Sequence, residues 1–173
     1  MDTEPTPWSY PVALAEIPEA GGHYEISADP ETRAAVAEAA ALRDVAQLDA
    51  TFDLTRLGDS VKVRGTVTAK VGQTCVVTLE PIETGVSEDI DLLFSPPFDP
   101  LLDPEAARKS GKGEPPEPLD EDNLDLGAIA TEFLILGLDP YPRKPGAEFD
   151  LPKERDEEAA HPFAALAALK KTQ

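Results

Sequence analysis

The chain has 173 residues, enough for one domain with a hydrophobic core and too few for two complete ones. Its 34 acidic residues outnumber its 15 basic residues, giving a net charge of −19. That charge opposes non-specific binding to nucleic acid, where affinity comes from neutralising phosphates. It favours either a basic protein partner or a solvated, highly soluble surface. Both interpretations stay open.

The sequence shows no sign of secretion, disulfide bonding or membrane insertion. The chain has one cysteine, so no internal disulfide can form. Its first ten residues, MDTEPTPWSY, lack the basic and apolar regions of a signal peptide. No stretch approaches the roughly 18 apolar residues of a membrane-spanning helix. We therefore expect a soluble, cytoplasmic protein that makes no contact with membranes.

The N-terminal region predicts two extended segments followed by a helix. Residues 8–18 suit an edge strand because Pro11 cannot donate a ladder hydrogen bond. Residues 21–27, GGHYEIS, predict a turn and a second extended segment. Asp29 then fits a helix cap and Pro30 fits the first helical position, so a helix is expected over residues 29–43.

The centre of the chain shows the clearest alternation of apolar and polar residues. Residues 61–71 place valines and alanine on one face and polar residues on the other, which predicts a half-buried strand. The apolar face comprises Val61, Val63, Val67, Ala69 and Val71, and Gly65 belongs to the same series. Residues 48–55 alternate in the same way, and residues 57–60 predict the turn that joins these two strands.

Two further short strands are expected at residues 74–81 and 85–94, joined by a hairpin turn at 82–85. Four consecutive strands indicate an antiparallel meander. The predicted fold class is α+β, with a curved antiparallel sheet that is either open or curled towards a small barrel. A helix at residues 124–137 is expected to pack over this sheet.

The C-terminal half predicts more irregular structure. Residues 97–123 are rich in proline, glycine and acid, typical of a long, exposed, mobile loop. The following helix places Leu126, Ile129, Phe133 and Leu136 on one side, with Asp122 or Asn123 as its cap. Residues 139–146, DPYPRKPG, exclude a regular element. We expect residues 145–173 to form an extended tail with a short terminal helix, which is either a docking peptide or a frayed end.

The sequence is poor in groups that converge for catalysis. His23 and His161 belong to no recognisable motif, and Cys75 lies among strand-forming residues, where cysteine is usually a small hydrophobic residue. A structural zinc site needs four nitrogen or sulfur ligands. Acidic pairs such as Glu88–Asp89 are expected to be solvated. The sequence therefore predicts a single domain over residues 1–173 with no catalytic, metal or cofactor site.

Basic and apolar residues outside the expected core are the candidates for interaction. Lys62, Arg64 and Lys70 share the polar face of one strand, where they either meet phosphate or are neutralised by neighbouring carboxylates. The full set of candidate interaction residues is Lys62, Arg64, Lys70, Tyr141, Arg143, Lys144, Phe163, Leu166 and Leu169.

Three segments in order resemble one family. Residues 61–96, VKVRGTVTAKVGQTCVVTLEPIETGVSEDIDLLFSP, are similar to the central region of the YceD family, the large ribosomal RNA subunit accumulation proteins. LDLGAIATEFLILGLDPYPRKPG (124–146) resembles its helix and proline-rich segment in the alphaproteobacterial branch. HPFAALAALKK (161–171) resembles its closing motif. The resemblance covers the chain from about residue 45 to the end, apart from the loop.

The family carries a Cys-x-Arg-Cys stretch that this chain matches only in part. Cys75 matches the first cysteine, Val77 replaces the arginine, and Thr78 replaces the second cysteine. A metal or redox role that depends on the cysteine pair is therefore not expected here. On this comparison too, Cys75 is interpreted as a strand residue.

The resemblance implies a non-enzymatic ribosome-biogenesis factor that supports normal levels of large-subunit (23S) ribosomal RNA. Association by gene neighbourhood implies ribosomal protein thirty-two of the large subunit as a partner. The charge of −19 favours a mechanism in which the acidic loop and tail shield a basic assembly partner. The alternatives are direct binding of ribosomal RNA through Lys62, Arg64, Lys70, Arg143 and Lys144, and an enzyme centred on Cys75 or His23.

Overall fold

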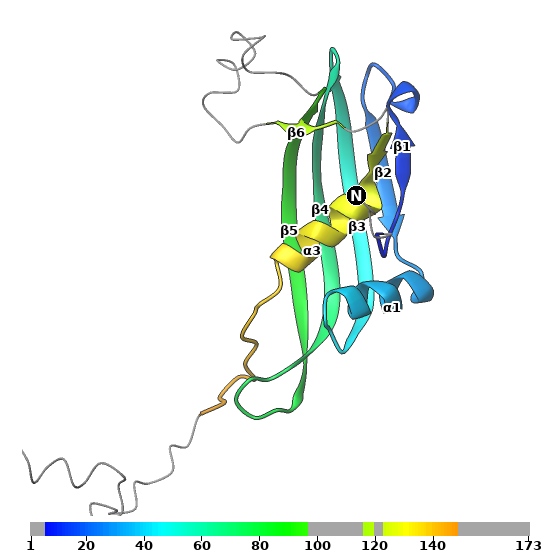
Figure 1. The fold of residues 1–173 in the computed structure, drawn as a ribbon. Helices are drawn as coiled ribbons and strands as arrows, with labels where there is room; N and C mark the ends of the chain where they lie inside the picture. The colour runs from blue at the N-terminus through cyan, green and yellow to red at the C-terminus, as the bar shows by residue number, and fades with distance from the viewer. Residues whose placement is uncertain (1–5, 97–115, 120–122, 149–173) are drawn as a thin grey trace, which may run out of the picture.

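A computed structural model describes residues 6–96, 116–119 and 123–148 (Figure 1). A five-stranded sheet has the order β2-β3-β4-β5-β6, and a separate two-stranded sheet pairs β1 with β7. The strands are β1 (Pro11–Ala13), β2 (Gly22–Ser27), β3 (Asp44–Leu57), β4 (Ser60–Thr74), β5 (Pro81–Ser95), β6 (Glu117–Pro118) and β7 (Asn123–Asp125). The helices are the 3-10 helix η1 (Leu14–Glu16), α1 (Pro30–Ala39) and α3 (Leu126–Leu136).

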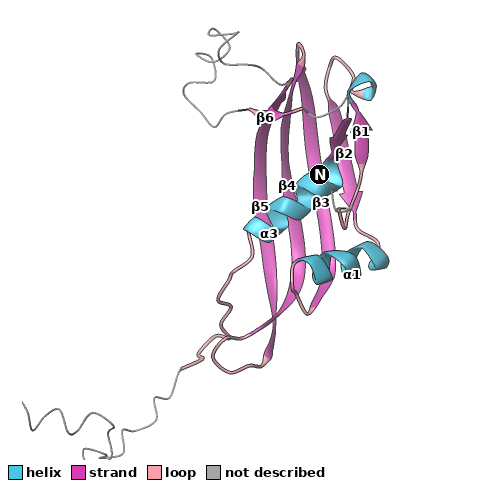
Figure 2. Ribbon diagram, in the orientation of Figure 1, coloured by secondary structure: helices cyan, strands magenta, loops and turns pink. Residues whose placement is uncertain are grey.

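The fold class is α+β, as predicted, and the larger sheet is open over the described residues rather than closed into a barrel. Strands β2 to β5 form a continuous antiparallel meander, whereas the short β6 adds to β5 in parallel. Both α1 and α3 lie on the same face of this sheet (Figures 1 and 2). None of the helices in the described part of the chain is long and apolar enough to cross a membrane.

The predicted position of the third meander strand, residues 74–81, is wrong, whereas the strand predicted at residues 85–94 is present as part of β5. Residues 75–80 form the connecting turn, and residues 82–85 lie inside the long β5 instead of forming a hairpin. Val76 and Val77 favour strands locally, but Leu79 adopts a left-handed φ of 60° that ends the extended conformation. β4 therefore runs on to Thr74, which pairs with Pro81.

The core lies between the sheet and the two helices. The alternation predicted for β4 is confirmed, because its five apolar side chains are all buried. Phe52 of β3 is fully buried and lies opposite Gly65 of β4. A side chain at Gly65 would meet the carbonyl of Thr51 and, at 3.0 Å, the ring of Phe52. Glycine at this position therefore makes room for the aromatic ring.

The N-terminal strand is shorter than predicted. Only Pro11–Ala13 is extended, and η1 follows immediately, with the N–H of Ile17 donating to Leu14 O at 3.3 Å. β1 pairs with β7 rather than with the edge of the main sheet. The second extended segment and the first helix are confirmed as β2 and α1. Asp29 caps α1 by accepting a hydrogen bond from the N–H of Thr32 at 2.8 Å.

The helix predicted at residues 124–137 is present as α3, and Leu126 and Ile129 are buried as predicted, but its cap and the end of its buried face differ from the prediction. Asp125, the last residue of β7, caps the helix by accepting a hydrogen bond from the N–H of Ala128. Leu134 is fully buried, whereas Leu136 is 71% exposed. Leu126, Ala130 and Leu134 are spaced four residues apart and face the sheet, and Leu136 lies two positions beyond that stripe.

Most of the predicted acidic loop (97–123) lies outside the described residues. Its described part, residues 116–119 and 123, is not simply exposed, because it contains β6 and the first residue of β7, and Leu119 is 9% exposed. Residues 139–148 contain no helix or strand, as predicted for the proline-rich segment. The predicted terminal helix, with Phe163, Leu166 and Leu169, lies outside the described part of the chain.

Candidate interaction surface

The turn between β4 and β5 is closed by backbone hydrogen bonds. The N–H of Cys75 donates to Glu80 O at 2.9 Å, and the N–H of Leu79 donates to Cys75 O at 2.9 Å. Thr78 strengthens the turn further, since its hydroxyl accepts from the N–H of Glu80 at 3.4 Å. These bonds give residues 75–80 a defined shape without regular secondary structure.

The proline-rich segment after α3 is fastened to this turn. Gln73 Nε2 donates to Asp139 O at 3.0 Å, and the N–H of Val76 donates to Pro142 O at 2.9 Å. The N–H of Lys144 donates to Cys75 Sγ at 3.3 Å. Pro142 is buried in the process. Three contacts therefore fix a segment whose prolines exclude a helix or a strand of its own.

Cys75 is a turn residue, so its predicted strand position is wrong. Its side chain is fully buried, and its sulfur accepts hydrogen bonds from the N–H groups of Lys144 and Thr78, the second at 3.4 Å. These hydrogen bonds, the one from Lys144 first, lower the pKa of the thiol to about 6. The sulfur therefore joins the turn to the proline-rich segment.

We expect Cys75→Ala to lower the free energy of unfolding by about 2 kcal/mol, because two amides lose their acceptor. Cys75→Ser should cost less, since its hydroxyl still accepts a hydrogen bond. Urea unfolding followed by circular dichroism under reducing conditions measures both. Equal losses in the two variants would show that the sulfur contributes only by filling space.

The contribution of Cys75 to the free energy of unfolding should depend on pH. The folded state lowers the pKa of Cys75 from 9.0 to about 6, so its stabilisation is complete above the unfolded value. The stabilisation is lost as pH falls through the folded value. The difference in unfolding free energy between the native chain and Cys75→Ala should therefore grow from about pH 6 to about pH 9. A difference that does not change with pH would contradict this.

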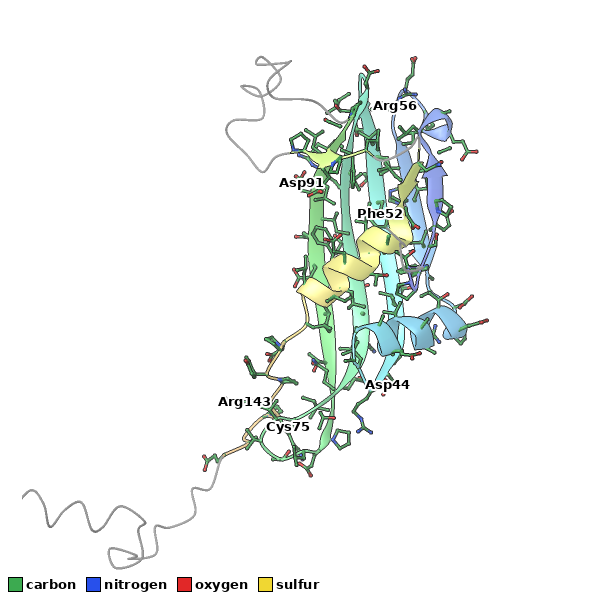
Figure 3. The ribbon with its side chains drawn as sticks, viewed as in Figure 1. Asp44, Phe52, Arg56, Cys75, Asp91 and Arg143 are labelled. Atoms are coloured by element: carbon green, nitrogen blue, oxygen red, sulfur yellow. The ribbon has the colours of Figure 1, made fainter. Side chains whose placement is uncertain are left out.

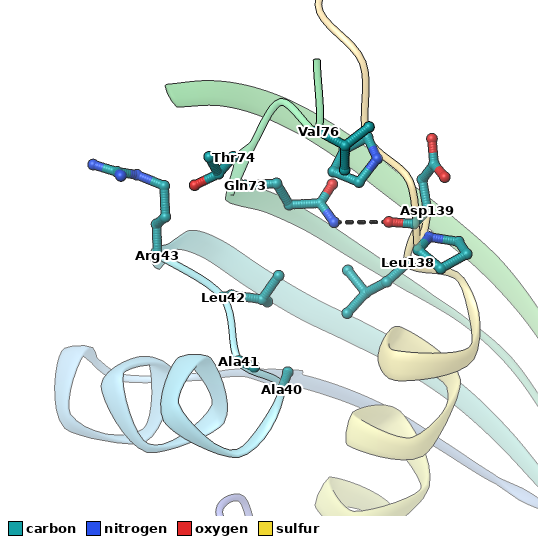
Figure 4. A pocket seen from close by; sticks show the side chains of 11 residues that line it. Ala40, Ala41, Leu42, Arg43, Gln73, Thr74, Val76, Leu138 and Asp139 are labelled. Atoms are coloured by element: carbon teal, nitrogen blue, oxygen red, sulfur yellow. Dashed lines mark hydrogen bonds between the residues drawn. The ribbon is translucent and has the colours of Figure 1, made fainter. Parts of the chain in front are cut away.

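A cleft of about 350 Å³ lies between the end of α1, the end of β4 and the proline-rich segment (Figure 4). Ala41, Leu42, Leu138 and Pro140 supply much of its apolar lining, and Arg43 and Asp139 contribute charged groups. The Oε1 atom of Gln73, which also lines the cleft, is buried without a hydrogen-bond partner among the described residues. Sequence analysis did not single out Gln73, because a glutamine at a strand end carries no distinctive pattern.

Tyr141 and Arg143 are the candidate residues that this arrangement exposes. Tyr141 is 71% exposed, and Arg143 is also exposed, on the other side of the buried Pro142. Lys144 instead binds Glu80, with Nζ 2.9 Å from Oε2. This contact raises the pKa of Lys144 and lowers that of Glu80. The segment therefore presents one aromatic and one basic side chain from a fixed backbone.

The other basic candidates lie on the polar face of β4, and two of them are far from Arg143. Lys62 Nζ is 3.0 Å from Asp91 Oδ1, and Arg64 Nε is 3.3 Å from Asp91 Oδ2. Lys62, and more weakly Arg64, lower the pKa of Asp91. Figure 3 shows Asp91 and Arg143 towards opposite ends of the sheet. Lys70 is exposed and makes no ion pair within the described part of the chain.

A small acidic cluster surrounds His23 on the polar face of the sheet. Its Nδ1 atom is 2.8 Å from Asp53 Oδ1, and its Nε2 atom is 3.4 Å from Glu25 Oε1. The hydrogen bond with Asp53, followed by that with Glu25, raises the pKa of His23. Across residues 6–96, 116–119 and 123–148, no group of three or more His, Cys, Asp and Glu side chains is arranged to hold a metal ion.

The structure is that of an acidic α+β sheet protein. It has an open meander, helices on one face of that meander, and a proline-rich segment fastened at the β4–β5 turn. A family model described as large ribosomal RNA subunit accumulation protein YceD matches residues 63–170, more than half of the chain. The chain belongs to this family. No curated protein and no solved structure matches it significantly.

Proposed function

We propose that the chain is a non-enzymatic, cytoplasmic ribosome-biogenesis factor that supports accumulation of 23S ribosomal RNA by binding a basic assembly partner of the large subunit. The family match over residues 63–170 supports the role in large-subunit RNA accumulation. The net charge of −19 supports the chemistry of the partner, because large-subunit proteins must be basic enough to bind RNA. Ribosomal protein thirty-two is the first partner to test.

The described ion pairs make direct RNA binding the weaker alternative. Of the five basic residues that could meet phosphate, Lys62 and Arg64 bind Asp91, and Lys144 binds Glu80. Phosphate would have to displace carboxylates that are already in place, so these three residues would contribute little affinity. Lys70 and Arg143 alone form too small a positive surface to offset the acidity of the chain.

The role is tested by the ratio of large- to small-subunit ribosomal RNA in cells that lack the gene. We expect the ratio to fall on deletion and to recover when the gene is restored. An unchanged ratio would contradict the proposed role. Restoring the Cys75→Ser variant, which keeps the acceptor at the turn, should also recover the ratio, whereas an enzyme that depends on the thiol would not tolerate it.

The partner is tested with purified full-length chain and purified ribosomal protein thirty-two. We expect binding at low ionic strength that weakens steadily as salt is added, because contacts between exposed charges are screened. A fragment of 23S ribosomal RNA serves as the competing probe. Binding of the RNA alone, with none to the basic protein, would favour the direct RNA-binding alternative instead.

A further inference from the structure

Strand β5 offers a long edge with no strand beside it in the described part of the chain. It has 15 residues, and only Phe94 and Ser95 pair with β6. As far as the described residues go, the thirteen residues from Pro81 to Leu93 therefore pair with a strand on the β4 side alone. The outward N–H and C=O groups of such an edge are a template for another extended chain.

The end of this edge already binds an extended segment. Glu117 and Pro118 pair with Phe94 and Ser95, and the N–H of Leu119 donates to Ser95 O at 2.8 Å. A chain added along Pro81–Leu93 would continue the same ladder. The edge is thus both geometrically regular and competent for strand addition.

Carboxylates flank the free edge on both faces of the sheet. Glu88 points to the face covered by α3, since its partner Val67 is buried, and Asp89 points to the opposite face. The Glu88 side chain lies against Gly137 at the C-terminal end of α3, where a Cβ would be 2.7 Å from its Oε1 atom. The last turn of α3 has no basic residue. The C-terminal end of α3 and the Glu88 carboxylate therefore both contribute negative potential, and no basic side chain in the last turn of α3 offsets it.

Apolar side chains lie next to these carboxylates. Ile135 and Leu136, in the last turn of α3, are 43% and 71% exposed. Figure 1 shows this end of α3 reaching the β5 side of the sheet. On the opposite face, Leu93 of β5 is 39% exposed. An added strand would cover apolar surface as well as meet charge.

We propose that the free edge of β5 binds an extended, lysine- or arginine-rich segment of a partner protein by strand addition. Adjacent basic residues of that segment would point to opposite faces and meet Glu88 and Asp89, while an apolar residue covers Leu136. This rests on the proposed function, because it identifies where and how the basic partner binds. It adds a main-chain component that charge attraction alone does not supply.

A second copy of the chain is a poorer fit to the same edge. Two β5 strands paired antiparallel would bring the Glu83, Glu88, Asp89 and Asp91 side chains of one copy close to those of the other. Like charges opposite one another across strands destabilise pairing. The net charge of −19 on each copy adds to this repulsion.

A short synthetic peptide in which pairs of adjacent lysines alternate with pairs of valines tests the main-chain component, because each lysine pair presents one charge to each face of an added strand. The matched control is the same peptide with every backbone amide N-methylated, which keeps its charge but removes the N–H donors from both of its edges. We expect the full-length chain to bind the control at least about tenfold more weakly by isothermal titration calorimetry. Equal affinities, or no binding of the unmodified peptide, would overturn the proposal.

Variants of the chain test the location. Glu88→Gln with Asp89→Asn should weaken binding of the unmodified peptide about tenfold, because both charge contacts are lost. The matched control, Glu31→Gln with Glu38→Gln, removes two exposed carboxylates from α1 and should leave affinity nearly unchanged. Equal losses in both pairs would show general charge attraction and overturn the proposed site.

Ribosomal protein thirty-two separates this inference from the function on which it rests. The native chain and the variant with both Glu88→Gln and Asp89→Asn are compared. If both bind ribosomal protein thirty-two equally well, the strand-addition site is wrong while the proposed function stands. If neither chain binds it in any salt while the peptide result holds, the site stands and the partner is wrong. If sedimentation shows that the chain forms a dimer and that this dimer depends on β5, the edge is assigned to a second copy and the proposal is overturned.

Discussion

Phe52→Ala should lower the free energy of unfolding by about 4 kcal/mol, because it leaves a large cavity at the centre of the core. Phe52 is fully buried and lies between two neighbouring strands, opposite Tyr24 of β2 and Gly65 of β4. Since Gly65 has no side chain, nothing on β4 can move in to fill the space that the ring vacates. Relaxation around the cavity should therefore be limited.

Phe52→Leu is the matched control, since it keeps most of the apolar volume and should cost about 1 kcal/mol. Urea unfolding of both variants, followed by circular dichroism, gives the two free energies. A loss below about 2 kcal/mol for the alanine variant would mean that the strands collapse around Gly65.

The central meander was predictable because the alternation of apolar and polar residues along a long strand indicates which of its side chains are buried. Residues 61–71 alternate over their whole length, so β4 was placed correctly and its buried face was identified. The same reasoning failed after Thr74. Val76 and Val77 have strand propensity there, but the turn is set by two backbone hydrogen bonds, one between Cys75 and Glu80 and one between Leu79 and Cys75. Local strand propensity does not indicate those hydrogen bonds.

The ends of elements were harder to predict because they depend on contacts distant in sequence. The cap of α3 was expected at Asp122 or Asn123, but β1 pairs with Asn123–Asp125 and delays the start of the helix. That pairing joins residues more than a hundred positions apart. The exposure of Leu136 has the same origin, since the position of α3 on the sheet decides which apolar residues are covered.

The candidate surface was predictable in composition but not in arrangement. Sequence analysis selected the basic residues and gave neutralisation by neighbouring carboxylates as one alternative for Lys62, Arg64 and Lys70. Asp91 binds the first two, whereas Lys70 has no ion pair within the described residues. Sequence analysis could not show that Lys144 and Cys75 meet through a backbone amide, or that most of β5 has no strand on its outer side among the described residues. Both features depend on which segments are neighbours in space, and the sequence pattern does not encode this.

Asp125→Ala should lower the free energy of unfolding by about 3 kcal/mol, because one carboxylate accepts three hydrogen bonds. Its Oδ1 atom accepts from the N–H of Ala128 at 3.0 Å, which caps α3, and from the N–H of Tyr10 at 2.8 Å. Its Oδ2 atom accepts from the Ser9 hydroxyl at 2.6 Å. The side chain therefore starts the helix and holds the N-terminal segment against it.

Two variants separate these roles of Asp125. Asp125→Asn keeps a cap and one oxygen acceptor, so it should cost about 1 kcal/mol. Ser9→Ala removes only the hydroxyl contact and should cost less than that. Chemical denaturation gives the three free energies, and hydrogen exchange at the N–H of Leu126, which donates to Tyr10 O at 3.0 Å, reports whether the N-terminal segment detaches. If Asp125→Ala left that amide protected, the packing of Trp8 rather than the carboxylate would hold the two segments together, since Gly127 lies directly beneath the Trp8 backbone.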